Sequence, residues 1–394
     1  MKKLVVSIVV AILIAGAYMF GTLNASKTIA VPPAAWADNS EAAQAWRQFV
    51  ASMEAAGARV FAAHQDPQEQ LEGIIYLAQM ASVSLEMKLA KGDPARPKFT
   101  DWMSDYRKFL GDSPDAAYHT AELSAEYEYQ ITGNIADTEY LSFALYGTSL
   151  NGWNRAADNI SNQSIRFDDD GNFTIIISKN KPADSDVDWL KMEDDIHMVM
   201  VRQYDHNLSS KQGSRFAIRN LAPPAFAIAT DSDIAKGLNR ATIFFNSTLD
   251  GAIALSNILS TGPNTIDPPK TYSADFGGIF YPTADNLYYG SWFYLEDDEA
   301  LIVEGLVPNA PYWGVSLQNR WMQSLDYEHY NVSLNDDEIS TENGRYRVIV
   351  SHQKPPSGNW LDTTGKKEGL LSIRYQLPES SEKPSITLVK FSDL

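Results

Sequence analysis

The sequence predicts an α+β protein that is mainly β. Three observations support this class: an apolar run near the N-terminus, helical periodicity after it, and short alternating runs separated by turn residues in the C-terminal half. The expected units are a membrane anchor or signal segment (1–25), a tether (26–40), a helical region that packs on the next domain (41–110), a β-rich domain with a terminal helical segment (111–265) and an antiparallel, jelly-roll-like β-sandwich (270–394).

The N-terminal run Leu4–Phe20 is uncharged, and its 17 residues are near the lower limit for crossing the hydrocarbon core of a bilayer. Lys2 and Lys3 precede it, which predicts an N-terminus inside and the bulk of the chain outside. We therefore expect a single inner-membrane anchor with the globular part in the periplasm. The alternative is a signal peptide cleaved after Ala25, which would leave a secreted or periplasmic protein.

The composition limits the kinds of partner and site. The chain has 50 acidic and 32 basic residues, a net charge of −18. Because nucleic-acid binding requires a basic face, no nucleic-acid partner is expected. The absence of cysteine excludes disulfides, thiolate metal sites and a cysteine nucleophile. The six histidines show no H-E-x-x-H spacing, so neither a metal site nor a cofactor is predicted.

Helical periodicity marks three segments. The first begins after a cap at Asn39 or Ser40, and its apolar face is formed by Trp46, Phe49, Val50, Met53, Val60 and Phe61. The second runs from about residue 68 to 89 and ends at Gly92 and Pro94. The third covers residues 231–260, with Asp231 or Ser232 as the expected cap.

Alternation of apolar and polar residues predicts the strands. It is clear at Tyr127, Tyr129 and Ile131, and residues 138–147 and 196–204 are further strands. Residues 164–178 predict a hairpin that turns at Asp170-Gly171. Turn signals at short intervals then predict the sandwich strands 286–295, 300–307, 312–318, 346–353, 370–377 and 385–391.

The stretch GNWLDTTGKKEG, residues 358–369, looks like a phosphate-binding loop but lacks its pattern. Trp360 stands where the first glycine belongs, Lys367 stands where Ser or Thr belongs, and a strand rather than a helix follows. We instead predict a turn in which Asp362 accepts backbone hydrogen bonds and Gly365 is left-handed. Trp360 would wedge this turn against the sandwich.

A second dense segment, residues 311–335, combines an arginine with aromatic and amide side chains. Arginine beside aromatic rings can hold a carboxylate, a phosphate or a sugar acid. The candidate ligand-binding residues are Asn319, Arg320, Trp321, Asn359 and Trp360. The alternative is structural: Arg320 pairs with Asp326 or Asp362 and joins two loops.

Catalysis would require an acid or base within hydrogen-bonding reach of a substrate. No nucleophile elbow is present, because Asn151 replaces the second glycine of that motif. The candidate groups are Tyr118, His119, Arg202, Asp326, Tyr330, His352 and Asp362. They would form an active site only if the fold brings them together.

Several motifs resemble the bacterial domain-of-unknown-function family numbered twelve-fourteen, in its longer version with a helical and β-rich N-terminal half. They include residues 94–123 and 128–147, the arginine of MVRQ (Arg202), and residues 312–335 and 358–369, and the likeness covers roughly residues 90–380. Trp360, Leu361, Asp362 and Gly365 match the last motif, whereas Lys366 stands where relatives often have histidine. The resemblance implies a C-terminal β-sandwich similar to a jelly-roll and no established reaction.

Three hypotheses about function follow. The first is a membrane-anchored cell-envelope protein that binds a small organic ligand (a sugar, a lipid or an organic acid) in a cleft between β domains. The second is an exported hydrolase- or lyase-like enzyme, and the third is a structural or assembly protein of the envelope. The expected partners are a small molecule and, through the N-terminal helix, the membrane.

Overall fold

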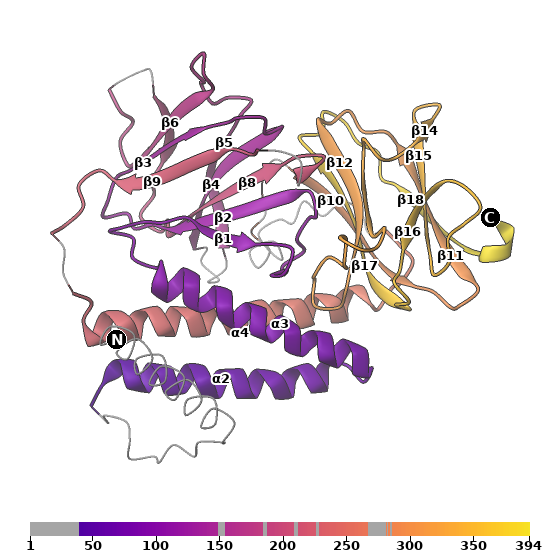
Figure 1. Ribbon diagram of the computed structural model, residues 1–394, viewed down its shortest axis with the longest axis horizontal. Helices are drawn as coiled ribbons and strands as arrows, with labels where there is room; N and C mark the ends of the chain where they lie inside the picture. The colour runs from indigo at the N-terminus through magenta and orange to yellow at the C-terminus, as the bar shows by residue number, and fades with distance from the viewer. Residues whose placement is uncertain are drawn as a thin grey trace, which may run out of the picture.

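The computed structural model describes residues 39–148, 154–183, 187–208, 212–225, 228–266, 281, 283 and 286–394. In these residues two β-rich parts lie end to end, and three long helices run beneath them along the long axis (Figure 1). Strands outnumber helices and most pair antiparallel, which confirms a mainly β protein of the α+β class.

The predicted anchor, Leu4–Phe20, lies outside the described residues. Among the helices that the structure describes from residue 39 onward, none is both long enough and apolar enough to cross a membrane.

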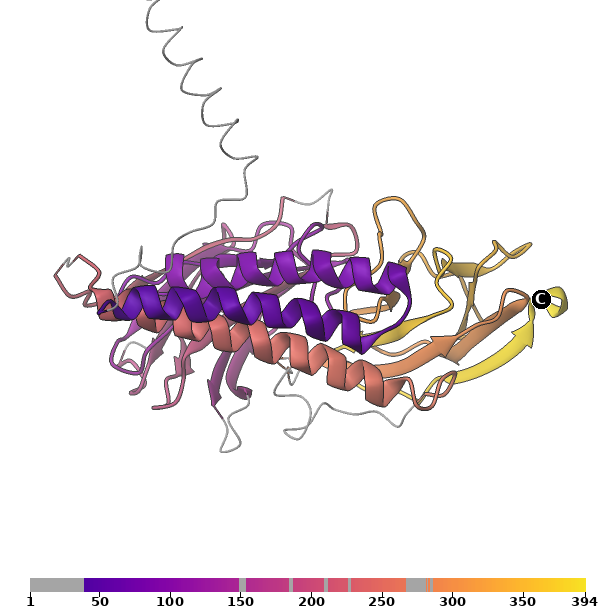
Figure 2. The same ribbon diagram turned by 90° about the horizontal axis from the view of Figure 1, so that it is seen from below.

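The three long helices lie side by side, as the view from below shows (Figure 2). All three predicted helical segments are confirmed: they form α2 (Glu41–Ala63), α3 (Pro67–Leu85), which continues into the π-helical turn η2 (Glu86–Ala90), and α4 (Asp231–Leu259). A short 3-10 turn, η5 (Phe391–Asp393), ends the chain.

The helix caps explain where α2 and α4 begin. Ser40 caps α2 by accepting from the backbone N–H of Ala43, as expected. The cap of α4 is Thr230, which forms a capping box with Asp233, so the prediction of Asp231 or Ser232 was wrong. Asp231 instead accepts from the Ser40 hydroxyl at 2.6 Å, so this carboxylate joins the first turns of two helices.

The N-terminal β part consists of two sheets. Sheet 1 has the order β1-β2-β8-β4-β5 and sheet 2 the order β7-β6-β3-β9. The strands of sheet 1 are Thr100–Met103 (β1), Ala116–Glu122 (β2), Tyr140–Thr148 (β4), Asn154–Ser161 (β5) and Met198–Tyr204 (β8). Those of sheet 2 are Tyr129–Asn134 (β3), Asn172–Ser178 (β6), Asp188–Lys191 (β7) and Arg215–Asn220 (β9).

The C-terminal β part also has two sheets. Sheet 3 has the order β10-β17-β12-β13, and sheet 4 the order β14-β15-β11-β18 with β16 paired to β15. Sheet 3 contains Asn286–Tyr294 (β10), Tyr312–Gln318 (β12), Ser333–Asn335 (β13) and Glu368–Gln376 (β17). Sheet 4 contains Glu299–Leu306 (β11), Thr341–Glu342 (β14), Arg345–Ser351 (β15), Asn359–Asp362 (β16) and Ser385–Lys390 (β18).

Two details of the strand prediction were wrong. Residues 165–168 form no strand, because Asp168 closes a tight turn by accepting from the backbone N–H of Asn172, and β6 pairs with β3 instead. The pairing of β15 with β16 is parallel rather than antiparallel. Asn359 holds β16 there by donating to the backbone oxygens of Ser340 and Arg347.

Three apolar cores hold these layers together. One fills the space between sheets 1 and 2, a second the space between sheets 3 and 4, and the third lies between the helices and the other face of sheet 1. The third core extends to the C-terminal part, where the buried ring of Trp321 stacks on Tyr76 of α3 at a centroid distance of 6.0 Å. Gly73 makes this approach possible, since a Cβ there would lie 2.7 Å from the indole ring.

Candidate functional site

The candidate site is a cavity between the two β parts, where one face of sheet 1 meets the outer face of sheet 3. We call it the inter-sheet pocket. Because side chains alternate along a strand, every second residue from Leu370 to Arg374 on β17 faces it, and Tyr118 of β2 and Arg202 of β8 face it from sheet 1. Its lining residues are Trp102, Met103, Leu110, Gly111, Tyr118, Arg202, Leu255, Tyr288, Gln318, Met322, Leu370, Ser372 and Arg374.

Arg202 enters the pocket from sheet 1. It is 4% exposed and lies directly across from Tyr118 in the register of β2 and β8. Its Nη2 donates to the hydroxyl of Tyr146 at 3.0 Å and to the carbonyl oxygen of Tyr281 at 2.6 Å. Its Nη1 has no hydrogen-bond partner. One end of this guanidinium is thus held by the protein, and the other keeps unused donors.

Arg374 enters from sheet 3 and is 7% exposed. Its Nη2 donates to the carbonyl oxygen of Gly111 at 2.9 Å, while its Nε has no partner. The guanidinium carbon lies 5.2 Å from the centre of the Tyr288 ring, within cation–π range. Because arginine stays protonated in proteins, Arg202 and Arg374 bring two positive charges to one buried cavity.

Neither guanidinium forms an ion pair with a carboxylate of the described residues. The buried carboxyl of Asp112 is close enough to interact electrostatically with Arg374, but both its oxygens accept from Ser324, at 2.9 Å from the backbone N–H and at 2.6 Å from the hydroxyl. Burial raises the pKa of Asp112, against the opposing effect of these hydrogen bonds. Asp112 therefore does not neutralise either arginine by direct contact.

Tyrosines surround the two arginines and supply neutral hydroxyl groups. The hydroxyls of Tyr118 and Tyr204 are 3.5 Å apart, and that of Tyr312 donates to Asp115 at 2.8 Å. Burial raises the pKa of Tyr118 and of Tyr312 well above the ordinary value. The hydroxyls of Tyr118 and Tyr312 therefore stay protonated at physiological pH, and that of Tyr118, which lines the pocket, can hydrogen-bond a ligand but does not serve as a base.

The remaining lining is apolar except for the hydroxyls of Tyr288 and Ser372 and the amide of Gln318, which is fully buried. Its Nε2 donates to the backbone oxygen of Asp112 at 3.2 Å, and its Oε1 has no partner. The centre of a water-sized sphere can occupy about 70 Å³ of the cavity. At 10–15 Å³ for each water, this is room for about five to seven water molecules, or for a small organic molecule.

The loops that close the pocket have an unusual backbone. Leu110, Gly111 and Met322 have φ values of +53°, +74° and +59°, in the left-handed region that bulky residues rarely adopt. The N–H of Gly111 donates to the carbonyl oxygen of Met322 at 2.8 Å, so the two loops support each other. Backbone strain of this kind is concentrated at functional sites.

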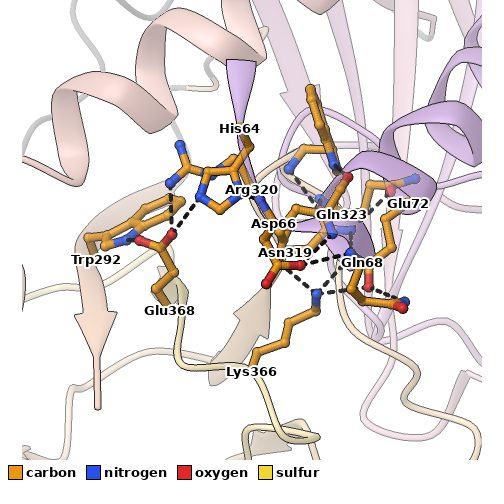
Figure 3. A network of polar contacts seen from close by, with 12 residues as sticks. His64, Asp66, Gln68, Glu72, Trp292, Asn319, Arg320, Gln323, Lys366 and Glu368 are labelled. Atoms are coloured by element: carbon orange, nitrogen blue, oxygen red, sulfur yellow. Dashed lines mark hydrogen bonds and ion pairs between the residues drawn. The ribbon is translucent and has the colours of Figure 1, made fainter. Parts of the chain in front are cut away.

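A second polar cluster joins the C-terminal part to the helices and contains the predicted ligand-binding arginine (Figure 3). Arg320 pairs with Glu368 at 2.9 Å, not with Asp326 or Asp362 as the structural alternative expected. Glu368 also accepts from the indole of Trp292 at 2.8 Å and contacts His64 at 3.0 Å. Burial raises the pKa of Glu368, but the hydrogen bonds from Trp292 and Arg320 outweigh it and lower the pKa overall.

The lysine of the TTGKKEG turn lies beside this cluster. Lys366 contacts the carboxylates of Glu69 and Glu72 on α3 at 2.8 Å, and Asn319 donates to Glu72 at 3.0 Å (Figure 3). The turn itself is as predicted: Asp362 accepts from a backbone N–H two residues on, and Gly365 has φ +78°. This motif therefore ties a sandwich turn to a helix.

The predicted catalytic residues do not converge. Tyr118 and Arg202 line the inter-sheet pocket, whereas Asp326 and Tyr330 lie in a separate polar groove beside α3. The other three are engaged elsewhere: His119 bonds Asp101 at 2.9 Å and packs on Phe216, His352 bonds Thr363 at 2.6 Å, and Asp362 holds its own turn.

The predicted ligand-binding residues also lie outside the pocket. Asn319 and Arg320 belong to the cluster of Figure 3. Trp321 is fully buried and donates to the backbone oxygen of Glu69 at 2.8 Å. On β16, Trp360 donates to the hydroxyl of Ser351 at 3.0 Å, and Asn359 caps two backbone oxygens. All five hold the fold together by contacts within the protein.

Sequence reasoning missed most of the pocket, notably Arg374, Tyr288 and Gln318. One signal was available: Leu370, Ser372 and Arg374 occupy alternate positions of a predicted strand, so a charged residue had to share a face with apolar ones. The sequence of one strand does not show, however, that this face of sheet 3 packs against sheet 1.

Two groups of side chains bring potential metal ligands within 4.8 Å of one another. In the first, His206 uses both ring nitrogens on carboxylates, contacting Glu139 and, at 2.9 Å, Asp336. The second, Asp326, Glu328 and His329, is exposed to solvent. Exposed acidic groups of this kind are common on so acidic a chain, and neither group indicates a metal centre.

Comparison with known proteins supports the predicted resemblance. Residues 113–207 and 290–380 match the family model described as "Protein of unknown function (DUF1214)". Arg202 lies in the first matched segment and Arg374 in the second. No curated protein matches the chain.

One solved structure supports the fold. The chain is similar to an uncharacterized protein from Burkholderia cenocepacia, with 28% identity, a TM-score of 0.82, and coverage of 89% of this chain and 98% of the other. It also matches the VPA0106 protein from Vibrio parahaemolyticus with 12% identity and a TM-score of 0.46, over 80% of this chain and 98% of the other.

Proposed function

We propose that this protein binds a small organic ligand in the inter-sheet pocket. The observation that carries the proposal is that three residues lining one cavity, drawn from both β parts, have buried side-chain atoms without a hydrogen-bond partner among the described residues: Arg202 Nη1 from sheet 1, and Arg374 Nε and Gln318 Oε1 from sheet 3. Buried polar atoms nearly always have a hydrogen-bond partner. A ligand that forms hydrogen bonds with several of these unpaired atoms at once would account for their arrangement. Apolar walls with a few polar anchors are typical of ligand pockets.

Binding accounts for the pocket better than catalysis does. Among the described residues that line the pocket there is no histidine and no carboxylate, and burial keeps the hydroxyl of Tyr118 neutral. General acid–base catalysis requires a group whose pKa lies near the working pH. The hydrolase- or lyase-like alternative therefore has no supporting group in this cavity.

We also propose that the protein works in the cell envelope, with a C-terminal part built as a jelly-roll-like sandwich. Leu4–Phe20 and the two lysines before it support an inner-membrane anchor with the folded part in the periplasm, and cleavage after Ala25 is the alternative. Protease treatment of spheroplasts is the test. Digestion of the folded part in intact spheroplasts supports export, and protection until lysis opposes it.

The binding proposal can be tested by filling the pocket. Ser372 is a small, half-buried lining residue, so Ser372→Phe should occupy the cavity without requiring the core to expand. We expect the full-length wild type to release a small molecule on denaturation, detected by mass spectrometry, and the variant to release at least tenfold less. Ser385→Phe, on the exposed edge strand β18, is the matched control and should retain the molecule.

Equal retention by Ser372→Phe, with the same melting temperature as the wild type, would place the ligand elsewhere. A wild type that releases nothing, and whose unfolding no small molecule affects, would favour the structural or assembly alternative.

A further inference from the structure

We infer that the ligand of the inter-sheet pocket is a small organic anion, whose compact acidic head lies between Arg202 and Arg374 and whose uncharged body lies against the apolar wall. This inference rests on the proposed binding function and adds the chemical class of the ligand. Carboxylate and phosphate heads share the required chemistry, and the experiment below distinguishes them.

The first argument is the contrast with the other buried arginines. Arg107, 6% exposed, pairs with Glu86 at 2.9 Å, and Arg320, 7% exposed, pairs with Glu368 at the same distance. Arg202 and Arg374 are equally buried but have only neutral partners. Burial of an unpaired charge is costly, and two such charges at one cavity compound that cost. An anion between them would supply the missing counter-charge.

The second argument is the way in which the protein holds the two guanidinium groups. Each guanidinium is held at Nη2 by a carbonyl oxygen, Tyr281 for Arg202 and Gly111 for Arg374. These contacts fix both groups before any ligand arrives, and they leave Nη1 of one and Nε of the other without partners. Charge-assisted bonds from two preorganised guanidinium groups select a planar or tetrahedral oxyanion over a neutral molecule.

The third argument limits the rest of the ligand. The apolar part of the lining is formed by Trp102, Leu110, Leu255, Met322 and Leu370, which are all buried. An uncharged apolar body fits this surface, and a second charge does not. The volume of about 70 Å³ excludes a diacyl lipid or a nucleotide. Gln318 Oε1, also unpaired, can accept one hydrogen bond from a hydroxyl or amide of the ligand.

The test uses calorimetric titration of the full-length protein, after removal of any bound small molecule, with matched probes. Butyrate, hexanoate and benzoate are compared with butyramide, hexanamide and benzamide, and with inorganic phosphate and phenyl phosphate. We expect each acid that binds to do so at least tenfold more tightly than the amide of the same shape, and at least one of the three acids to bind. Preference for phenyl phosphate over benzoate would assign a phosphate head, and the reverse a carboxylate head.

Variants link the selectivity to the two arginines. Arg202→Met and Arg374→Met should each abolish the preference for the acid, while Arg219→Met, an exposed arginine of β9, leaves it unchanged. The melting temperature of the empty protein is a second readout. It should stay the same or rise in Arg374→Met, because an unpaired buried charge is removed, whereas a purely structural arginine would lower it.

The outcomes separate the two proposals. Amides that bind in the pocket as tightly as the acids would overturn the anionic class and leave the binding function standing. If no probe binds and Arg374→Met lowers the melting temperature, the arginines are structural and the anion inference fails. The binding function itself is then decided by the release experiment with Ser372→Phe.

Discussion

At the scale of single residues, the buried arginines differ in what surrounds them rather than in how deeply they lie. Arg320 meets a carboxylate, a tryptophan face and an amide, and its guanidinium carbon is 5.1 Å from the centre of the Trp292 ring. Arg202 and Arg374 meet hydroxyl and carbonyl oxygens and tyrosine rings, and neither contacts a carboxylate of the described residues. We therefore propose a structural role for Arg320 and ligand binding for Arg202 and Arg374.

The structural role of Arg320 predicts a stability loss in Glu368→Gln. The variant keeps the shape of the side chain but leaves a buried guanidinium without its counter-charge. Breaking such a pair costs about 2–3 kcal/mol at a site that is partly open to solvent. Urea unfolding at pH 7 measures the change. Glu296→Gln, which breaks the exposed pair with Lys367, should have little effect, and an equal loss in both variants would contradict this role.

Sequence reasoning reached the residue scale only in part. Tyr118 and Arg202 were predicted as site residues, and both line the pocket, because a polar group on a buried strand is informative on its own. Arg320 was assigned to ligand binding since its neighbours in the sequence are aromatic and polar. Its partner, Glu368, is 48 residues away and could not be identified from local spacing.

At the scale of elements, the helices were predictable and their contacts were not. Apolar periodicity located α2, α3 and α4, and Ser40 was a recognisable cap. The false hairpin at residues 164–178 shows the limit, because two β-rich runs around Asp170-Gly171 look alike whether or not they pair with each other. Pairing of β6 with β3 depends on sheet 2 as a whole.

Two helical glycines give a matched test of helix packing. Gly73 on α3 contacts Val60 and Trp321, and a Cβ there would lie 2.4 Å from Val60 Cγ1. Gly57 on α2 has nothing within 4 Å of the same position. We expect Gly57→Ala to stabilise the protein by about 0.5–1 kcal/mol, from helix propensity alone. Gly73→Ala should instead destabilise it by about 1–3 kcal/mol through overpacking.

Thermal unfolding of both variants measures the change in stability, which should be positive for Gly57→Ala and negative for Gly73→Ala. Stabilisation by Gly73→Ala would mean that the contact between α3 and Trp321 is looser than described.

At the scale of the whole molecule, a titratable cluster joins the two β parts beside the pocket. His206, after β8, bonds Glu139 and Asp336, and Asn335 donates to the backbone oxygen of His206 at 2.8 Å. Burial lowers the pKa of His206, but the charges and hydrogen bonds of Asp336 and Glu139 outweigh it and raise the pKa. Protonated His206 therefore holds carboxylates from both parts.

This cluster predicts how stability depends on pH. A raised pKa in the folded state means that the contribution of His206 is full below about pH 6.5, its unfolded value, and is lost as the pH rises through the folded value. Burial also raises the pKa of the neighbouring Asp115 to about 6. The stability that Asp115 contributes is therefore lost as the pH rises from the ordinary pKa of an aspartate to about 6, a lower range than that of His206. Of these two groups, only His206 should therefore contribute to the pH dependence above pH 6.5.

Urea unfolding between pH 6 and 8.5 checks this assignment. The wild type should become less stable as the pH rises, and His206→Gln and Asp336→Asn should both flatten the dependence. A slope that persists unchanged in both variants would show that the cluster does not join the two parts.

The central claim is that the two β parts enclose a binding site for a small organic anion. A high-resolution crystal structure of the full-length protein tests it most directly. We predict density for a compact acidic group within 3.2 Å of both Arg202 Nη1 and Arg374 Nε, with an uncharged body against Trp102. Ordered water alone, or a carboxylate of the protein's own chain paired to both arginines, would contradict the claim.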